Sequence, residues 1–326
     1  MIKVCKTDEL NHDEWTQLTN GFNICFNTNH NVEHLKEFYK NTIKGYSYHA
    51  LDIDDETGKL RGYNSFFPTE YRYKGKILLG GISGGTYVLP EYRKDVLIFM
   101  NLMSSLFKYC KNEDMIIKVG VPNKNSFKYT IKINKAKLVG YLNYYIFPLK
   151  PFRLLKNKAM QRLDFIPYTF AWLWLLISQL IAFLFNFQKK DCKFELNITP
   201  GFLKTRFSNS EVYNQIQNNR YNCYYRLYRE NNVDVAYLMD FREGDKRTFR
   251  ALIYALRNIM KKEDVAMILY VGTMNMPQII MLKLPHCLDP KPLPLTVNVL
   301  NKDKQILEDT TELASWDFGL INFDAR

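Results

Sequence analysis

The chain has 326 residues, of which 47% are hydrophobic and 15% aromatic, and its formal net charge is +12. This apolar content can form a core for about two domains and excludes a disordered or low-complexity protein. The 15 glycines and 12 prolines exclude collagen-like and proline-rich classes. The basic charge predicts anionic partners, such as nucleic acid, acidic lipid headgroups or a phosphorylated ligand, without choosing among them.

The cysteine spacing, the N-terminal residues and the histidine spacing predict a cytoplasmic protein without a metal site. The six cysteines are too far apart for a Cys-x-x-Cys pair, so we expect reduced thiols rather than a zinc knuckle. The N-terminus has no apolar export signal. His30 and His34 have a helical i, i+4 spacing, but no third ligand follows them.

The first half of the chain predicts a mixture of helices and strands. The expected elements are helices at 12–25 and 31–42, hairpin strands at 46–53 and 60–67, a strand at 77–88, a helix at 94–110, a strand at 115–121, a helix at 123–133 and a strand at 137–149. The hairpin is indicated by Asp and Gly in the turn 54–59. Asn134 tolerates the left-handed conformation found at helix ends.

The second half repeats much of this order. We expect strands at 221–229 and 233–241, a helix at 246–262, a strand at 265–271, a helix at 276–284 and a strand at 294–300. The alternation of apolar strands with amphipathic helices predicts a mixed α/β (α+β) fold built on a mixed sheet.

An internal duplication organises the chain. With an offset of 150 residues, four residues of the first half meet the same residue type in the second; they are Asp95, Phe99, Leu102 and Leu106, opposite Asp245, Phe249, Leu252 and Leu256. Apolar matches spaced by three and four residues lie on one helix face. Two ordinary amphipathic helices would give similar matches. We interpret the pattern as two related domains, 1–149 and 196–326, with a connector at 150–195.

The connector contains an apolar segment at 165–188 that has no charged residue and has basic residues on both sides. Its length permits a membrane span, but positive charge on both flanks gives no inside–outside asymmetry. We favour a helix that lies on an anionic membrane face, held by apolar burial and by its basic flanks. A helix buried between the halves or in a dimer interface, and a true span, are the alternatives.

The order of elements over residues 10–149 resembles that of the GNAT superfamily of acyl-CoA N-acyltransferases. The stretch 84–93 (GGTYVLPEYR) looks like the family's fourth strand and the turn after it, and 119–126 (VGVPNKNS) looks like the fifth strand and the next helix start. The second half resembles a degenerate second copy, as in two-domain GNAT and Fem-type proteins. Acyltransferase-like proteins of bacterial surface-polysaccharide gene clusters are similar in their late Trp and Asp, here Trp316 and Asp324.

The resemblance implies acetyl-CoA or another acyl-CoA as the donor, with its pantetheine arm paired to strand backbone and its pyrophosphate at a helix N-terminus. The residues it assigns to the donor are Tyr87, Val88 and Leu89 for the arm, Arg93, Lys94 and Asp95 for the pyrophosphate, and Asn123 with Ser126 beside the arm.

The phosphate loop departs from the family's pattern. Val96 and Ile98 stand where the family has small residues, and their branched side chains would block the close approach that glycine allows. Asp95 adds negative charge near the expected phosphate. Arg93 and Lys94 would then bind phosphate through their side chains, or they belong to a solvated helix start.

Acyl transfer to an amine requires a base for the amine and an acid for the leaving thiolate. The resemblance implies a tyrosine about seven residues after Asn123, and Tyr129 is the nearest candidate for the acid. Glu70 and Glu91 are candidate bases because they flank the expected cleft. Packing of Tyr129 and solvated surface positions for the two carboxylates are the alternatives. We expect the second copy to be non-catalytic and to shape the acceptor site.

The resemblance therefore predicts transfer of an acyl group, with acetyl favoured, from acyl-CoA to an amine. The expected acceptor is an amino sugar or lipid-linked saccharide at the cytoplasmic face of the membrane. The alternatives are a non-catalytic GNAT-derived scaffold at the membrane and a Fem-type transferase that uses aminoacyl-tRNA; beyond that case no nucleic-acid partner is expected. The transferase hypothesis requires a wedge between the strand ending at Val88 and the strand beginning at Met115.

Overall fold

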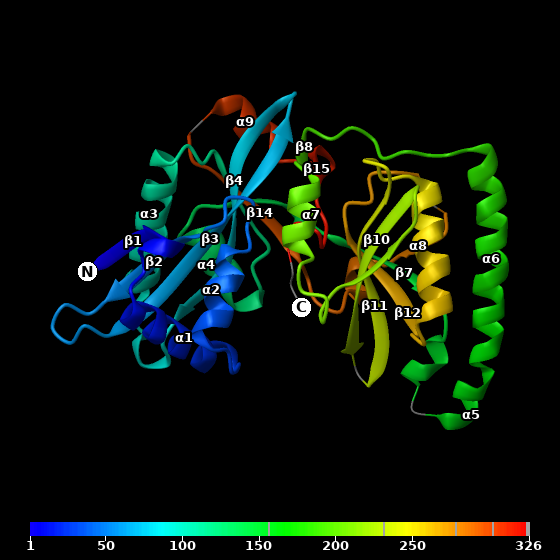
Figure 1. The fold of residues 1–326 in the computed structure, drawn as a ribbon, viewed down its shortest axis with the longest axis horizontal. Coiled ribbons are helices and arrows are strands. Elements are labelled where there is room, and N and C mark those ends of the chain that lie inside the picture. Colours follow the sequence, from blue (N-terminus) through cyan, green and yellow to red (C-terminus); the bar gives the residue numbers. More distant parts are fainter. Residues whose placement is uncertain (156, 231, 278, 302, 324–326) are drawn as a thin grey trace. The chain divides into compact units, whose positions relative to one another are not determined.

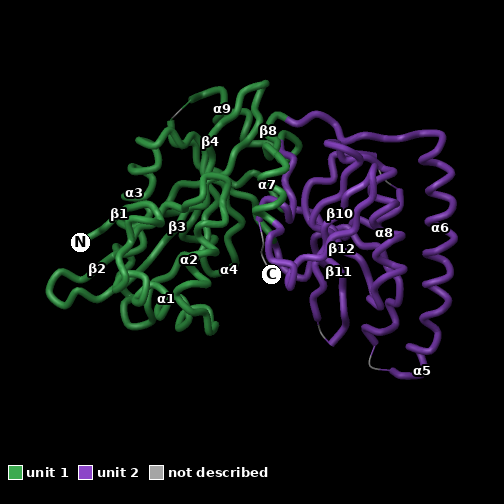
Figure 2. The backbone as a smooth tube through the Cα atoms, in the orientation of Figure 1, with its two compact units in different colours: residues 1–141, 193–206, 293–315 green, residues 142–192, 207–292, 316–326 purple. Residues whose placement is uncertain are grey.

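The computed structural model describes residues 1–323 except 156, 231, 278 and 302. These residues form two compact units that interleave along the chain (Figure 2). Unit 1 contains 1–141, 193–206 and 293–315, and unit 2 contains 142–192, 207–292 and the C-terminal segment from Trp316. The domains expected at 1–149 and 196–326 are each continuous in sequence, whereas each compact unit combines three separate segments of the chain.

Unit 1 is built on a mixed sheet with the strand order β1-β2-β3-β4-β5-β14-β6. The strands are β1 (Ile2–Lys6), β2 (Tyr48–Ile53), β3 (Leu60–Tyr73), β4 (Lys76–Val88), β5 (Ile117–Gly120), β6 (Lys137–Tyr141), β14 (Pro294–Val299) and β8 (Phe194–Leu196), which pairs with the far end of β3. β4 and β5 run parallel, and the other neighbours along this path run antiparallel.

The helices of unit 1 are α1 (His12–Phe26), α2 (Val32–Lys40), α3 (Val96–Asn112), α4 (Lys124–Lys132), α7 (Pro200–Arg206) and α9 (Lys304–Asp309). Three of them, α1, α2 and α3, cover the two faces of the sheet. Ala50 and Leu51 are neighbours in β2 but belong to two different core clusters, one with α3 and one with α1 and α2. Because successive strand residues point to opposite faces, α3 covers one face and α1 with α2 covers the other.

Unit 2 has its own sheet, with the order β13-β7-β12-β11-β10-β9. Its strands are β7 (Asn143–Pro148), β9 (Asn214–Gln217), β10 (Tyr221–Glu230), β11 (Val233–Glu243), β12 (Met267–Gly272), β13 (Leu282–Lys283) and, in the C-terminal segment, β15 (Trp316–Asp317). The helices are α5 (Lys158–Gln161), α6 (Phe165–Leu184) and α8 (Phe249–Lys262). α8 packs on the sheet, and α6 lies alongside α8 (Figure 1).

The sequence-based expectation of a single strand at 137–149 is wrong. The stretch forms β6, which pairs with β14 in the sheet of unit 1, and β7, which pairs with β12 in the sheet of unit 2. Leu142, between them, is fully buried. β14 comes from the second half of the chain, so each half contributes a strand to the other's sheet. Alternation of apolar residues identifies a strand but does not specify its partner.

The expectation of a helix at 276–284 is also wrong. The described residues of this stretch form bends and the short strand β13, which pairs with β7. Pro277 lacks the backbone N–H that a helix interior needs. The remaining helices of the two halves are found within a few residues of their expected positions.

The duplication is confirmed in the structure. In unit 1, α3 joins β4 to its parallel neighbour β5, and in unit 2, α8 joins β11 to its parallel neighbour β12. Of the residues that match at an offset of 150, the leucines and Phe249 are buried on these two helices and Phe99 is half-buried on α3, whereas Asp95 is the N-cap of α3 and Asp245 lies in the turn before α8. The fold is therefore a tandem of two related strand–helix–strand units.

Candidate functional site

The two central strands of unit 1 pair at one end only. Gly80, Gly81 and Ile82 of β4 pair with Ile117, Lys118 and Val119 of β5, and no pairing of these strands is found beyond Ile82 among the described residues. β4 continues for six more residues to Val88, whereas β5 ends at Gly120. Among the described residues, the segment 83–88 therefore has no strand partner on the side of β5, and we call this unpaired edge the first wedge.

A bulge lies in the wedge wall. The register of β3 and β4 shifts between Tyr63 and Ser65, where β4 contributes an extra residue. Gly85 in this bulge has a φ of +65°, and a Cβ there would lie 2.6 Å from Tyr39 Oη. Ser65 Oγ donates a hydrogen bond of 2.6 Å to the Gly84 carbonyl. The bulge therefore requires glycine, both for its backbone conformation and for space.

A buried polar cluster supports the bulge from the face covered by α1 and α2. His49 Nδ1 lies 2.6 Å from Tyr63 Oη, and His49 Nε2 lies 2.9 Å from Thr7 Oγ1. Burial lowers the pKa of His49 to about 3 and raises that of Tyr39 to about 12. The cluster is therefore uncharged at neutral pH, and it acts as a hydrogen-bonded support rather than as a base.

The strand residues assigned to the donor's arm are partly engaged within the protein. Tyr87 is buried, and its hydroxyl donates to the Leu18 carbonyl at 2.8 Å. The Leu89 amide donates to the Arg61 carbonyl at 2.9 Å, so it is already used. The Val88 carbonyl accepts from Arg93 Nε at 3.1 Å, which ties Arg93 to the end of β4.

The start of α3 carries its own negative charge. Asp95 is the N-cap, and its Oδ1 accepts a hydrogen bond of 2.9 Å from the Leu97 amide. This carboxylate lies where the helix dipole would favour a bound anion. Val96 is exposed, while Ile98 is buried against the sheet near Gly62. Lys94 is exposed beside the cap.

The start of α4 is capped by a predicted site residue. Asn123 Oδ1 accepts from the amides of Asn125 and Ser126, both at 3.0 Å, and Ser126 Oγ donates back to the Asn123 side chain. Tyr129 is 45% exposed, and its ring meets the edge of Phe99 of α3 at 5.9 Å between centroids. An aromatic contact therefore joins α3 to α4.

The two candidate bases lie in different settings. Glu70, in β3 opposite Leu79, accepts a hydrogen bond from Asn197 Nδ2 at 2.9 Å and pairs with Lys44 at 3.3 Å. Glu91 is exposed in the short turn that precedes α3. No contact joins either carboxylate to Tyr129 among the described residues.

The sequence analysis did not single out Lys118 of β5. It is the only charged residue in the apolar run 115–121, and this isolated charge was the available signal. Its side chain is 3% exposed, and burial lowers its pKa to about 8. Its ammonium lies 6.0 Å from the centre of the Phe66 ring, on the face covered by α3.

Unit 2 contains a corresponding wedge, and the C-terminal segment enters it. β11 and β12 pair only from Val235–Met267 to Tyr237–Leu269. Gly272 bonds β7 on one side and forms a bridge with Gly319 on the other. The Thr273 amide also donates to the Phe318 carbonyl at 2.7 Å. The C-terminal segment thus occupies the edge of β12 that faces β11.

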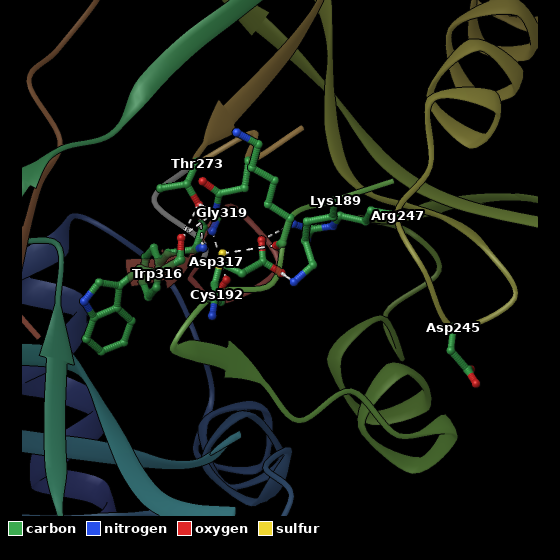
Figure 3. Close-up of polar contacts among 12 residues, drawn as sticks. Lys189, Cys192, Asp245, Arg247, Thr273, Trp316, Asp317 and Gly319 are labelled. Atoms are coloured by element: carbon green, nitrogen blue, oxygen red, sulfur yellow. Dashed lines mark hydrogen bonds and ion pairs between the residues drawn. The ribbon is translucent and has the colours of Figure 1, made fainter. Parts of the chain in front are cut away.

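A buried ion cluster fixes this segment (Figure 3). Arg247 pairs with Asp240 of β11 and with Asp317 of the segment, both at 2.8 Å, and donates to Tyr270 Oη at 3.3 Å. Lys189 pairs with Asp317 at 3.4 Å. Arg247 is 2% exposed and immediately precedes the N-cap of α8. A carboxylate of the chain itself therefore lies at the helix start of the second copy.

Other expectations concern the end of the chain and metals. Trp316 is fully buried, and Asp324 lies outside the described residues. Within the described part of the chain, no group of three or more His, Cys, Asp or Glu side chains is placed to hold a metal ion.

A bulged strand whose parallel partner diverges from it, with helices on both faces and a second copy in the same chain, is the fold of tandem GCN5-related N-acetyltransferases. Solved structures with this fold include GCN5-related N-acetyltransferases from Anabaena variabilis ATCC 29413 (TM-score 0.57, 11% identity) and Kribbella flavida (TM-score 0.58, 10% identity). A probable N-acyltransferase of unknown function from Enterococcus faecalis V583 is also similar (TM-score 0.55, 12% identity).

These similarities cover 92% of this chain and 73%, 71% and 73% of the three solved chains, respectively. They therefore extend over both units and show the fold alone. No family model matches the sequence, and no curated protein matches it.

Proposed function

We propose that the protein is an N-acyltransferase that moves an acyl group, acetyl in the simplest case, from acyl-CoA to an amine. The observation that carries this proposal is the wedge between β4 and β5, whose wall is bulged at Gly85. Backbone at a diverging strand edge can pair with the amides of a pantetheine arm. Arg93, fixed at the end of β4, and exposed Lys94 supply positive charge where the donor's phosphates would enter.

Calorimetry with acetyl-CoA and CoA tests this proposal. We expect saturable binding at micromolar concentrations, weakened by Gly85→Val, which would fill the bulge. Ile77→Val is the matched control because Ile77 is an exposed apolar residue at the opposite end of β4. Absence of heat with either ligand at high micromolar concentration would contradict the proposal.

One observation favours a second function, that of a GNAT-derived scaffold without a donor. Asp95 occupies the N-terminus of α3, and the Phe99–Tyr129 contact bridges α3 and α4. A protein that had lost acyl-CoA would retain such contacts. If Asp95→Ser together with Val96→Gly created CoA binding in a protein that otherwise has none, the scaffold function would be supported.

We further propose that the protein binds an anionic membrane face through α6, and that its acceptor is an amino sugar or lipid-linked saccharide at that face. Four residues of α6 are buried, namely Ala171, Leu175, Ser178 and Ala182, and all but Ser178 belong to the core cluster that includes α8. Most of its large apolar side chains are exposed, among them Phe170 (67%), Leu180 (69%) and Phe183 (77%). A continuous row of exposed large apolar side chains marks an interaction site.

The setting of α6 favours a position in the plane of the membrane surface. Exposed Lys158 and Arg162 precede the helix, and exposed Lys190 follows it. Arg250 of α8 donates to the carbonyls of Ala182 and Phe183, which holds the end of α6 against unit 2. By length and composition alone, Lys158–Leu184 could also cross a membrane. Basic residues at both ends suit a helix lying along one anionic leaflet.

Co-sedimentation with phosphatidylglycerol vesicles tests this placement. Phe170→Ser with Phe183→Ser should abolish binding, whereas Ile77→Ser in unit 1 should leave it unchanged, since Ile77 is similarly exposed (52%) but lies on β4. Equal binding of the two variants would contradict the role of α6. Acetyl transfer from acetyl-CoA to a panel of amino sugars, measured by mass spectrometry, tests the acceptor.

A further inference from the structure

Lys118 lies on β5 one residue before Val119, which forms the last pair with β4. In register it stands between Gly81 of β4 and Asn298 of β14. Its side chain is on the face covered by α3, because the ammonium lies over Phe66 of that core cluster. A Cβ built on Gly120 would lie 3.0 Å from Nζ. The Lys118 side chain therefore extends along β5 toward Gly120, beyond the last residue of β5 that pairs with β4.

Lys118 is only 3% exposed, and no hydrogen bond or ion pair of its ammonium is found among the described residues. Buried charges in proteins are nearly always paired or hydrogen-bonded, because desolvation is costly. On the neighbouring strand β14, Asn298 Oδ1 is buried without a hydrogen-bond partner. Unpaired polar groups inside a protein call for an explanation, and a bound ligand is one such explanation.

The direction of the donor follows from the wedge. If the arm runs along 83–88 with its phosphates near Arg93, its far end reaches the point where Ile82 and Val119 pair. That far end carries the thioester, and Lys118 precedes Val119 on β5. This step rests on the proposed function, because it uses the pantetheine arm as the ligand of the wedge.

We propose that the Lys118 ammonium donates a hydrogen bond to the thioester carbonyl oxygen of the bound acyl donor. Attack by the acceptor amine forms the C–N bond and places negative charge on this oxygen, and collapse breaks the C–S bond. The proton of the amine goes to the leaving thiolate, and Lys118 retains its own protons. A charged donor aimed at the developing oxyanion in a water-poor site stabilises the transition state.

Binding of two ligands that differ at the carbonyl tests the proposal. Acetyl-CoA has the thioester carbonyl and CoA lacks it, so Lys118→Met should weaken acetyl-CoA at least tenfold and CoA much less. Lys118→Gln, which keeps an N–H donor, should recover part of the loss. Lys128→Met is the matched control because Lys128 is exposed on α4. Melting temperatures of all variants show whether they fold.

The outcomes separate this proposal from the proposed function. Wild-type protein that binds acetyl-CoA, with Lys118→Met binding it equally well, would overturn the role of Lys118 and leave the acyltransferase proposal intact. Equal weakening of acetyl-CoA and CoA would overturn the assignment to the carbonyl. Wild-type protein that binds neither ligand would count against the acyltransferase proposal itself, and the role of Lys118 would fall with it.

Discussion

The two wedges of the molecule begin from the same geometry and end differently. In each, two parallel strands pair over three residues and then diverge, with a helix leading from one strand to the other. In unit 2 the C-terminal segment bonds the free edge of β12, and Asp317 pairs with Arg247 next to the start of α8. In unit 1 no described segment of the chain pairs with β4 between Ser83 and Val88 on the side of β5.

The difference shows how one copy of a fold can become structural while the other keeps an opening. A diverging strand edge leaves backbone groups that need partners, and unit 2 satisfies them with its own backbone and an internal carboxylate. Unit 1 instead has a buried lysine, Lys118, on β5, next to the last residue that pairs with β4. The first wedge is therefore the one in which a ligand would complete the structure.

The largest effect is expected from breaking the ion cluster of the second wedge. Arg247→Met removes the guanidinium between Asp240 and Asp317, although Arg242 and Lys189 still pair with them. Because loss of one partner of a buried pair costs about 3–5 kcal/mol, we expect a loss of stability up to this size. Urea unfolding followed by circular dichroism measures the change. Arg257→Met on α8 is the control, and equal stability of the two variants would show that the cluster does not hold the segment.

Lys118→Met should instead increase the stability of the protein. Burial lowers the pKa of Lys118 from 10.5 to about 8, so at pH 7 the folded state holds a desolvated charge. Its removal should stabilise the protein by about 3 kcal/mol. Because the folded pKa is lowered, wild-type stability should rise between pH 8 and 10.5 relative to the variant. Urea unfolding at pH 7 and pH 10 tests this, and a destabilised variant at pH 7 would contradict it.

His49 should make the first unit sensitive to acid. Its folded pKa of about 3 lies below the ordinary value of 6.5, so the unfolded state binds the extra proton between these pH values. Stability contributed by neutral His49 is complete above pH 6.5 and is lost as the pH falls, by about 2 kcal/mol at pH 5. His49→Gln should remove this component. Parallel pH profiles for variant and wild type would refute the assignment.

The smallest change in stability is expected when the N-cap of α3 or of α8 is replaced. Asp95 caps α3 by accepting from the Leu97 amide, and Thr248 caps α8 by accepting from the Ala251 amide, so replacement of either by Ala should cost about 1 kcal/mol. Only Asp95→Ala removes a negative charge at the first wedge, so it should also tighten CoA binding severalfold. Thermal melts and calorimetry on both variants measure these effects. If Thr248→Ala tightened CoA binding instead, this result would indicate that CoA binds at the second wedge.

Much of the fold could be predicted from local sequence. The amphipathic spacing of α3 and α8, the Asp-Gly turn of the first hairpin and the matches at an offset of 150 residues identified the elements and the duplication. The functional site was harder to predict from the sequence. Asn123 and Asp95 were recognised by position, yet their side chains turned out to be helix caps. Whether an oxygen caps its own helix or binds a ligand depends on local hydrogen bonds that residue spacing does not specify.

By itself the sequence determined most of the helices and strands of the two halves and the tandem arrangement, because hydrophobic periodicity and turn residues act over a few positions. Only the tertiary structure decided that β7 and β14 join the sheet of the other half, that Asp317 meets Arg247, and that Lys118 is buried. These features depend on partners far apart in the chain. Their free energy comes from burial and charge pairing that exist only once the chain has folded.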